Sequence, residues 1–95
     1  MITKELLDQA LEVWALARDR LVLEQAVWGN VLKSHDLLIA SLRANGHSWS
    51  QAQNEFKKIS DAHSRTLTAA WNDRDVRCEE YQILLKEFNL QSASA

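Results

Sequence analysis

The chain has 95 residues, 46% of them hydrophobic, with two glycines and no proline. Eleven Lys and Arg against 13 Asp and Glu give a formal net charge of −2. That balance lacks the basic excess typical of nucleic-acid-binding proteins, which counts against a nucleic-acid partner without excluding one. The single cysteine, Cys78, excludes an intrachain disulfide. Because the chain has no long apolar run and no signal-peptide pattern, we expect one cytoplasmic domain over residues 1–95, with no membrane contact.

The first predicted helix spans residues 3–45. Thr3 is its candidate N-cap, with Ile2 and Leu7 at the positions of a hydrophobic staple. The alternating spacing of three and four residues that coiled coils use continues without a phase change through Gly29-Asn30, which predicts one helix rather than two. The seam comprises Leu7, Ala10, Trp14, Ala17, Leu21, Glu24, Trp28, Val31, His35, Leu38 and Leu42, with Glu24 as its exception.

A turn at residues 46–48 separates this helix from a second one over residues 49–89, and the tail at 90–95 is expected to fray. Gly46 supplies a left-handed residue that ends the first helix. Ser48 and Gln51 form a Ser-x-x-Gln capping box that starts the next helix at Trp49. The second seam is expected to contain a one-residue stutter. Its residues are Trp49, Ala52, Phe56, Ile59, His63, Leu67, Trp71, Cys78, Tyr81, Leu85 and Phe88.

So short a turn predicts an all-α antiparallel hairpin of two long helices. The first helix carries further apolar residues on more than one face, whereas the second has one apolar stripe. Because a helix apolar on several sides is normally buried on several sides, we expect a homodimeric four-helix bundle or coiled coil. The alternatives are a compact monomer folded at Gly29-Asn30 and Asn72-Asp73, and a heteromeric partner. Candidate dimer and core residues are Leu7, Trp14, Leu21, Leu23, Val27, Trp28, Leu32, His35, Leu38, Ile39 and Leu42.

Residues that could carry chemistry form no recognisable site. His35 and His63 both fall on seams, and a metal centre needs three or four converging ligands. The sequence contains no HExxH motif, no phosphate-binding glycine loop and no nucleophile with a matching base. We therefore expect neither enzymatic activity nor a metal or cofactor.

The remaining hypothesis is a non-catalytic protein–protein interaction module, such as an adaptor, an assembly subunit or a phage-type inhibitor of a larger protein. The first helix would drive self-association, while the turn and the second helix would contact the larger partner. A tryptophan beside the turn is a plausible binding anchor, although it could instead close the end of the bundle. The partner-binding candidates are Trp49, Gln53, Phe56, Lys57 and Trp71.

Two other interpretations remain open. As a helix-turn-helix regulator, the segment 35–66 would present Ser60, His63, Ser64 and Arg65 to DNA, although it lacks a second turn near residue 60. The layout also resembles the Trp-x-Gly family of secreted helical hairpins, which share this length and place a tryptophan at the turn. Here the triplet is Trp49-Ser50-Gln51, without the glycine, and Tyr81 is followed four residues later by Leu85 rather than an acidic residue. That resemblance would imply a secreted helical-hairpin effector.

Overall fold

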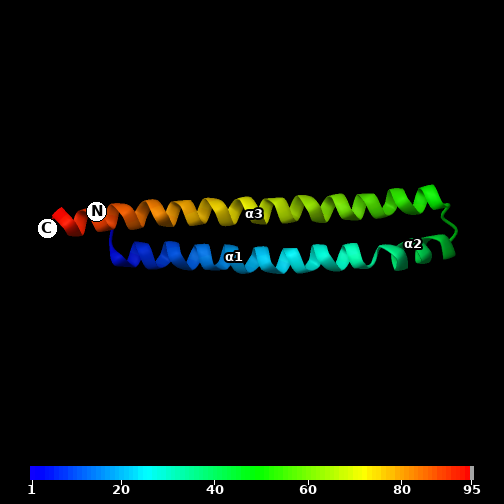
Figure 1. Ribbon diagram of the computed structural model, residues 1–95, viewed down its shortest axis with the longest axis horizontal. Helices are drawn as coiled ribbons and strands as arrows, with labels where there is room; N and C mark the ends of the chain where they lie inside the picture. Colours follow the sequence, from blue (N-terminus) through cyan, green and yellow to red (C-terminus); the bar gives the residue numbers. More distant parts are fainter. Residues whose placement is uncertain (95) are drawn as a thin grey trace. The chain divides into compact units, whose positions relative to one another are not determined.

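The computed structural model describes residues 1–94, and these form three helices without a strand. Helix α1 spans Lys4–Lys33, α2 spans His35–Ala44 and α3 spans Trp49–Ser94 (Figure 1). The all-helical class predicted from the seam pattern is confirmed. Within this part of the chain no helix is long and apolar enough to cross a membrane.

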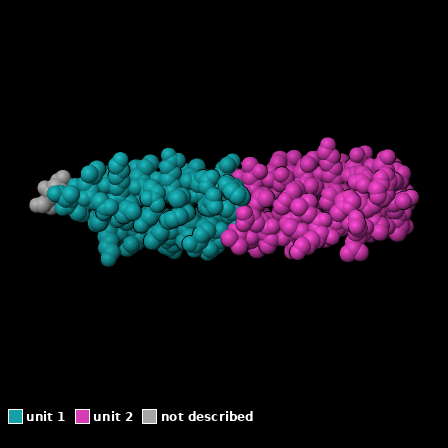
Figure 2. Space-filling view, in the orientation of Figure 1, with its two compact units in different colours: residues 1–21, 70–95 teal, residues 22–69 magenta. Residues whose placement is uncertain are grey.

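The chain divides into two compact units (Figure 2). Unit 1 combines Met1–Leu21 with the chain from Ala70 onward, and unit 2 is Val22–Ala69. Each unit therefore pairs part of α1 with part of α3 and has its own core. The buried apolar residues are few and mostly small: Leu7, Ala17, Leu21 and Ala70 in unit 1, and Ile39 and Ala52 in unit 2.

In unit 1, the start of α1 is fastened to the end of α3. The Thr3 hydroxyl accepts a hydrogen bond from the Leu6 amide at 3.2 Å, which confirms the predicted N-cap. The Ile2 amide donates to Gln91 Oε1 at 2.9 Å, and Gln91 Nε2 donates to the Ile2 carbonyl at 2.9 Å. These two hydrogen bonds lie near the end of α3, which continues to Ser94, whereas the sequence predicted fraying from residue 90. Ala95 lies outside the described residues.

In unit 2, the link between α2 and α3 has the predicted signals. Gly46 has a φ of 95°, and the Gly46 and His47 amides donate to the Arg43 and Leu42 carbonyls at 3.1 Å each. These two hydrogen bonds form the Schellman motif, which ends a helix with a residue in the left-handed conformation. The Ser48 amide donates to Gln51 Oε1 at 2.8 Å, and the Gln51 amide donates to Ser48 Oγ at 3.2 Å. The predicted capping box is therefore confirmed.

One interruption divides the helix expected over residues 3–45. It lies at Ser34, with φ −86° and ψ 1°, while α1 continues through Gly29-Asn30. The Ser34 hydroxyl donates to the Asn30 carbonyl at 2.8 Å instead of capping α2. A serine that bonds back to the preceding turn favours a bend in a helix, although Thr66 and Thr68 make the same bond inside α3 without an interruption.

The seam of α1 and α2 has the spacing expected from the sequence. All eleven of its residues, including Glu24, are buried or half-buried. The seam of α3 differs from the prediction, because its burial follows an uninterrupted three–four spacing with no stutter. Polar residues occupy several of these positions, whereas Ile59 and Trp71, expected on the seam, are exposed. The α3 seam comprises Gln53, Phe56, Ser60, His63, Leu67, Ala70, Arg74, Arg77, Tyr81, Leu84, Phe88 and Gln91.

Candidate interaction surface

Ring contacts show how the helices pair within each unit. In unit 1, Trp14 stacks on Tyr81 with centroids 5.6 Å apart and an interplanar angle of 27°. In unit 2, the His35 ring meets the edge of Phe56 at 4.6 Å and 89°. Together with Ile2–Gln91, the Trp14–Tyr81 contact makes the pairing in unit 1 antiparallel. His35 Nδ1 also lies 2.9 Å from Asp36 Oδ1.

Large exposed apolar side chains gather on one side of the seam in unit 1, whereas in unit 2 they are divided between the two sides. Each of those on the first side lies either one residue before or two residues after a residue from every second seam position. On the first seam these reference residues are Leu7, Trp14, Leu21 and His35, and on the α3 seam they are Ser60, Arg74, Tyr81 and Phe88. In an antiparallel pair, a two-fold rotation that exchanges the helices keeps such positions on the same side. We call this side the apolar flank. It comprises Leu6, Val13, Leu16, Val76, Ile83 and Leu90 in unit 1, and Leu23, Leu37 and Ile59 in unit 2.

The other side of the seam is less apolar. Its exposed large apolar residues are Leu11, Val22, Leu32 and Trp71. The asymmetry corrects one expectation, that α3 has a single apolar stripe. Val76, Ile83 and Leu90 form a second column on α3 with a spacing of seven residues. That spacing is a signal in the sequence, but the misplaced seam concealed it.

A shallow groove lies on the apolar flank of unit 2. It has a volume of about 290 Å³ and is lined by Val27, Asn30, Val31, Ser34, Leu38 and His63. The half-buried Val27 continues the column of apolar residues on α1. The interruption at Ser34 borders the groove, so the flank there is indented rather than smooth.

Trp49 stands at the start of α3, beside the turn in unit 2. Its side chain is 53% exposed, and the guanidinium of Arg43 lies 5.8 Å from the ring centroid. A second groove of about 310 Å³ joins Trp49 and Arg43 to Asp36, Ile39 and Ala40. The sequence singled out Trp49 but not Arg43, because no spacing rule links residues on opposite sides of a turn.

The five partner-binding candidates differ in burial and belong to both units. Trp49 and Lys57 are exposed, whereas Gln53 and Phe56 are half-buried on the seam, where Phe56 contacts His35. Trp71 belongs to unit 1, and its ring lies 5.1 Å from the guanidinium of Arg74. Arg74 could have been found from the sequence, because residues three apart are neighbours on a helix.

The dimer and core candidates also separate by burial. Leu7, Leu21 and Ile39 are buried, and Leu23 and Leu32 are exposed. The other six, Trp14, Val27, Trp28, His35, Leu38 and Leu42, are half-buried. Most of the candidates therefore lie on the seam of α1 and α2, while Leu23 belongs to the apolar flank.

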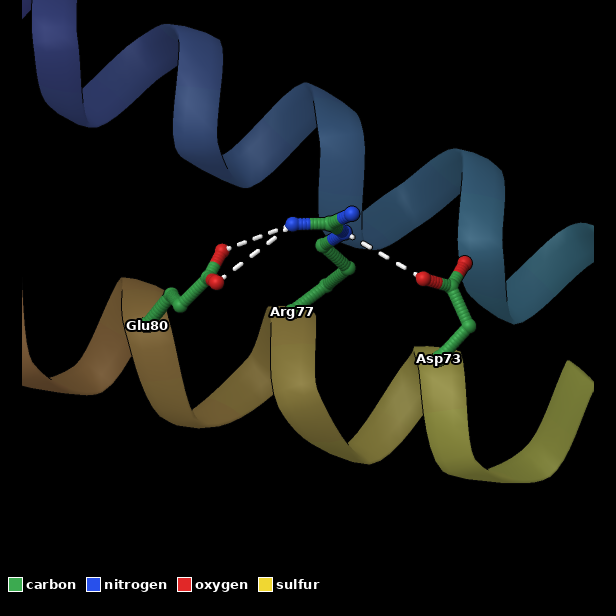
Figure 3. A network of polar contacts seen from close by, with 3 residues as sticks. All are labelled: Asp73, Arg77 and Glu80. Atoms are coloured by element: carbon green, nitrogen blue, oxygen red, sulfur yellow. Dashed lines mark hydrogen bonds and ion pairs between the residues drawn. The ribbon is translucent and has the colours of Figure 1, made fainter. Parts of the chain in front are cut away.

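An ion-pair network borders the apolar flank of unit 1 (Figure 3). Arg77 occupies a seam position on α3, with Nε 3.3 Å from Asp73 Oδ1 and Nη1 3.1 Å from Glu80 Oε2. The hydrogen bond to Glu80, followed by the charges of Glu80 and Asp73, raises the pKa of Arg77 above its ordinary value. The cationic guanidinium therefore bridges the two carboxylates, and its single charge offsets one of their two negative charges.

Among the described residues, no group of three His, Cys, Asp or Glu side chains is placed to hold a metal ion. The same residues contain no buried polar or charged side chain, and no buried side-chain nitrogen or oxygen atom among them lacks a hydrogen bond. Cys78 is a half-buried free thiol. The notable feature of the surface is thus apolar area rather than converging polar groups.

Comparison with known proteins finds no match to this chain among protein-family models, curated proteins or solved structures.

Proposed function

We propose that this chain is a non-catalytic protein–protein interaction module that works as a homodimeric four-helix bundle. Each copy would contribute an antiparallel hairpin of two long helices. The supporting observation is the apolar flank of unit 1, where Leu16 is 63% exposed and Ile83 is 51% exposed. Contiguous apolar surface of this kind marks protein interfaces in soluble proteins.

The amount of exposed area supports a partner chain. The solvent-accessible area is 6920 Å², whereas a folded monomer of 10.9 kDa keeps about 5,600 Å² by the usual scaling with mass. A standard interface buries about 800 Å² on each partner, which is less than this difference. A second copy could therefore cover the surplus.

The alternative of a compact monomer depends on chain reversals at Gly29-Asn30 and Asn72-Asp73. Helix α1 is continuous through the first pair and α3 is continuous through the second. Neither break is present, so another chain remains the simpler way to cover the apolar flank.

Light scattering on the purified protein tests the proposal. We expect a mass of about 22 kDa at micromolar concentrations, twice the 10.9 kDa of one chain. A mass of one chain across the whole concentration range would contradict the dimer, and with it the main support for an interaction role.

The larger partner protein would be contacted at the surface around Trp49, next to Arg43. Exposed tryptophan and arginine are the residues most often responsible for binding energy at interfaces. If Trp49 is a binding anchor, Trp49→Ala should weaken capture of the partner tenfold or more and leave the melting temperature within a few degrees. Asp61→Ala, at an exposed position further along α3 that is not among the partner-binding candidates, serves as the control. Loss of melting temperature with capture unchanged would show that Trp49 closes the end of the bundle.

A further inference from the structure

The apolar flank of unit 1 draws equally on both helices. Helix α1 contributes Leu6, Val13 and Leu16, and α3 contributes Val76, Ile83 and Leu90, with exposures between 43% and 63%. In four-helix bundles each helix contacts two neighbours, so it carries two apolar stripes on adjacent sides. Both helices of unit 1 have this pattern, with one stripe on the seam and the other on the flank.

Charged residues along the flank are distributed unequally between the helices. On α1 the corresponding position one residue before a seam residue holds Arg20, whereas on α3 it holds Asp73, Glu80 and Glu87. Arg77 pairs with both Asp73 and Glu80, but its one positive charge offsets only one of the three carboxylates, so the row along α3 stays acidic. If α3 of one copy lay on α3 of another, these acidic rows would face each other; α1 on α3 avoids this repulsion.

The heights of the residues along the helix axes also favour a dimer in which α1 of one copy packs on α3 of the other. The contacts Ile2–Gln91 and Trp14–Tyr81 place Leu16 at a height between Val76 and Ile83. A two-fold axis parallel to the helices keeps every residue at its own height. It would therefore insert Leu16 of one copy between Val76 and Ile83 of the other, without any sliding.

Resting on the proposed self-association, we propose that a second copy of this chain packs on the apolar flank of unit 1, with its α1 lying antiparallel on α3 of the first copy. The two copies exchange the same contacts, because a two-fold interface is formed by one surface on both chains. The first helix alone, on which the sequence placed the dimer contact, supplies only half of this interface.

Lysine substitutions on the two sides of the seam test which side is the interface. Leu6 and Leu11 have nearly equal exposures, 43% and 42%, but Leu6 lies on the flank and Leu11 lies on the opposite side. We expect Leu6→Lys and Leu16→Lys each to raise the dimer Kd tenfold or more, and Leu11→Lys to change it less than about threefold. Analytical ultracentrifugation gives the Kd, and circular dichroism confirms that each variant remains helical. A larger effect from Leu11→Lys would overturn the choice of the apolar flank as the interface, but it would still agree with the proposal that the chain dimerises.

Disulfide trapping tests the arrangement without destabilising the flank. Leu16→Cys and Val76→Cys are made separately, each together with Cys78→Ser, and the two chains are refolded alone or as a mixture. We expect a disulfide-linked dimer on oxidation of the mixture only. Linkage of the Leu16→Cys chain to itself would mean that α1 lies on α1 and would overturn the arrangement. A dimeric mixture that forms no disulfide would also overturn it, whereas a monomeric wild-type protein would mean that the proposed function itself fails.

Discussion

The two glycines show how much depends on conformation at the scale of one residue. Gly46 has a φ of 95°, a conformation that costs L-residues roughly 1 kcal/mol or more. Gly29 lies inside α1 with an ordinary helical conformation, and a Cβ built there meets nothing within 4 Å. The same substitution is therefore expected to have opposite effects at the two positions.

Gly29→Ala should raise the free energy of unfolding by about 0.5–1 kcal/mol, because alanine has the higher helix propensity and loses less backbone entropy. Gly46→Ala should lower it by about 1 kcal/mol or more through the positive φ. Urea denaturation followed by circular dichroism measures both. Destabilisation by Gly29→Ala would show that α1 is not a regular helix at that point.

At the scale of the element, the ends of the helices are specified more strongly than their seams. The reciprocal bonds between Ser48 and Gln51 fix the first residue of α3. By contrast, Arg74 and Arg77 occupy seam positions that coiled coils usually fill with apolar residues. They remain partly exposed and pair with Asp75, Asp73 and Glu80, which avoids burying an unpaired charge.

Removing the cap should therefore have a measurable cost. Ser48→Ala is expected to lower the free energy of unfolding by about 1 kcal/mol, because the Gln51 amide loses its acceptor. Ser50→Ala, in the same turn of α3, provides the matched control and should change it by only a few tenths of a kcal/mol. Equal effects of the two substitutions in thermal unfolding would argue against the capping box.

At the scale of the whole molecule, exposed apolar area is the dominant feature. The nine side chains of the apolar flank are between 38% and 77% exposed, and covering one recovers roughly 1 kcal/mol. Their sum is comparable to the total stability of a small domain, about 5–15 kcal/mol. Because a dimer is stabilised by mass action, the dimer mass expected from light scattering should persist at micromolar concentrations and decline only on dilution.

Local signals were readable from the sequence. Thr3, Gly46, Ser48 and Gln51 act through bonds to residues a few positions away, so short motifs identify them reliably. The seam of α1 and α2 was equally predictable from the sequence, because mostly apolar residues occupy it. The candidate binding residues were less predictable: Phe56 was expected both on the seam and in a partner contact, and the structure packs it on the seam against His35.

The sequence by itself determined the helical class, the turn and the helix starts, because these depend on local hydrogen bonds and apolar spacing. Only the tertiary structure decided the seam of α3, which contains Ser60, Arg74 and Arg77 and leaves Ile59 and Trp71, which hydrophobicity placed on it, exposed. An amphipathic helix with two apolar stripes has more than one way to face its neighbour, and pairing with α1 selects between them. That selection exposes Val76, Ile83 and Leu90 and so creates the apolar flank.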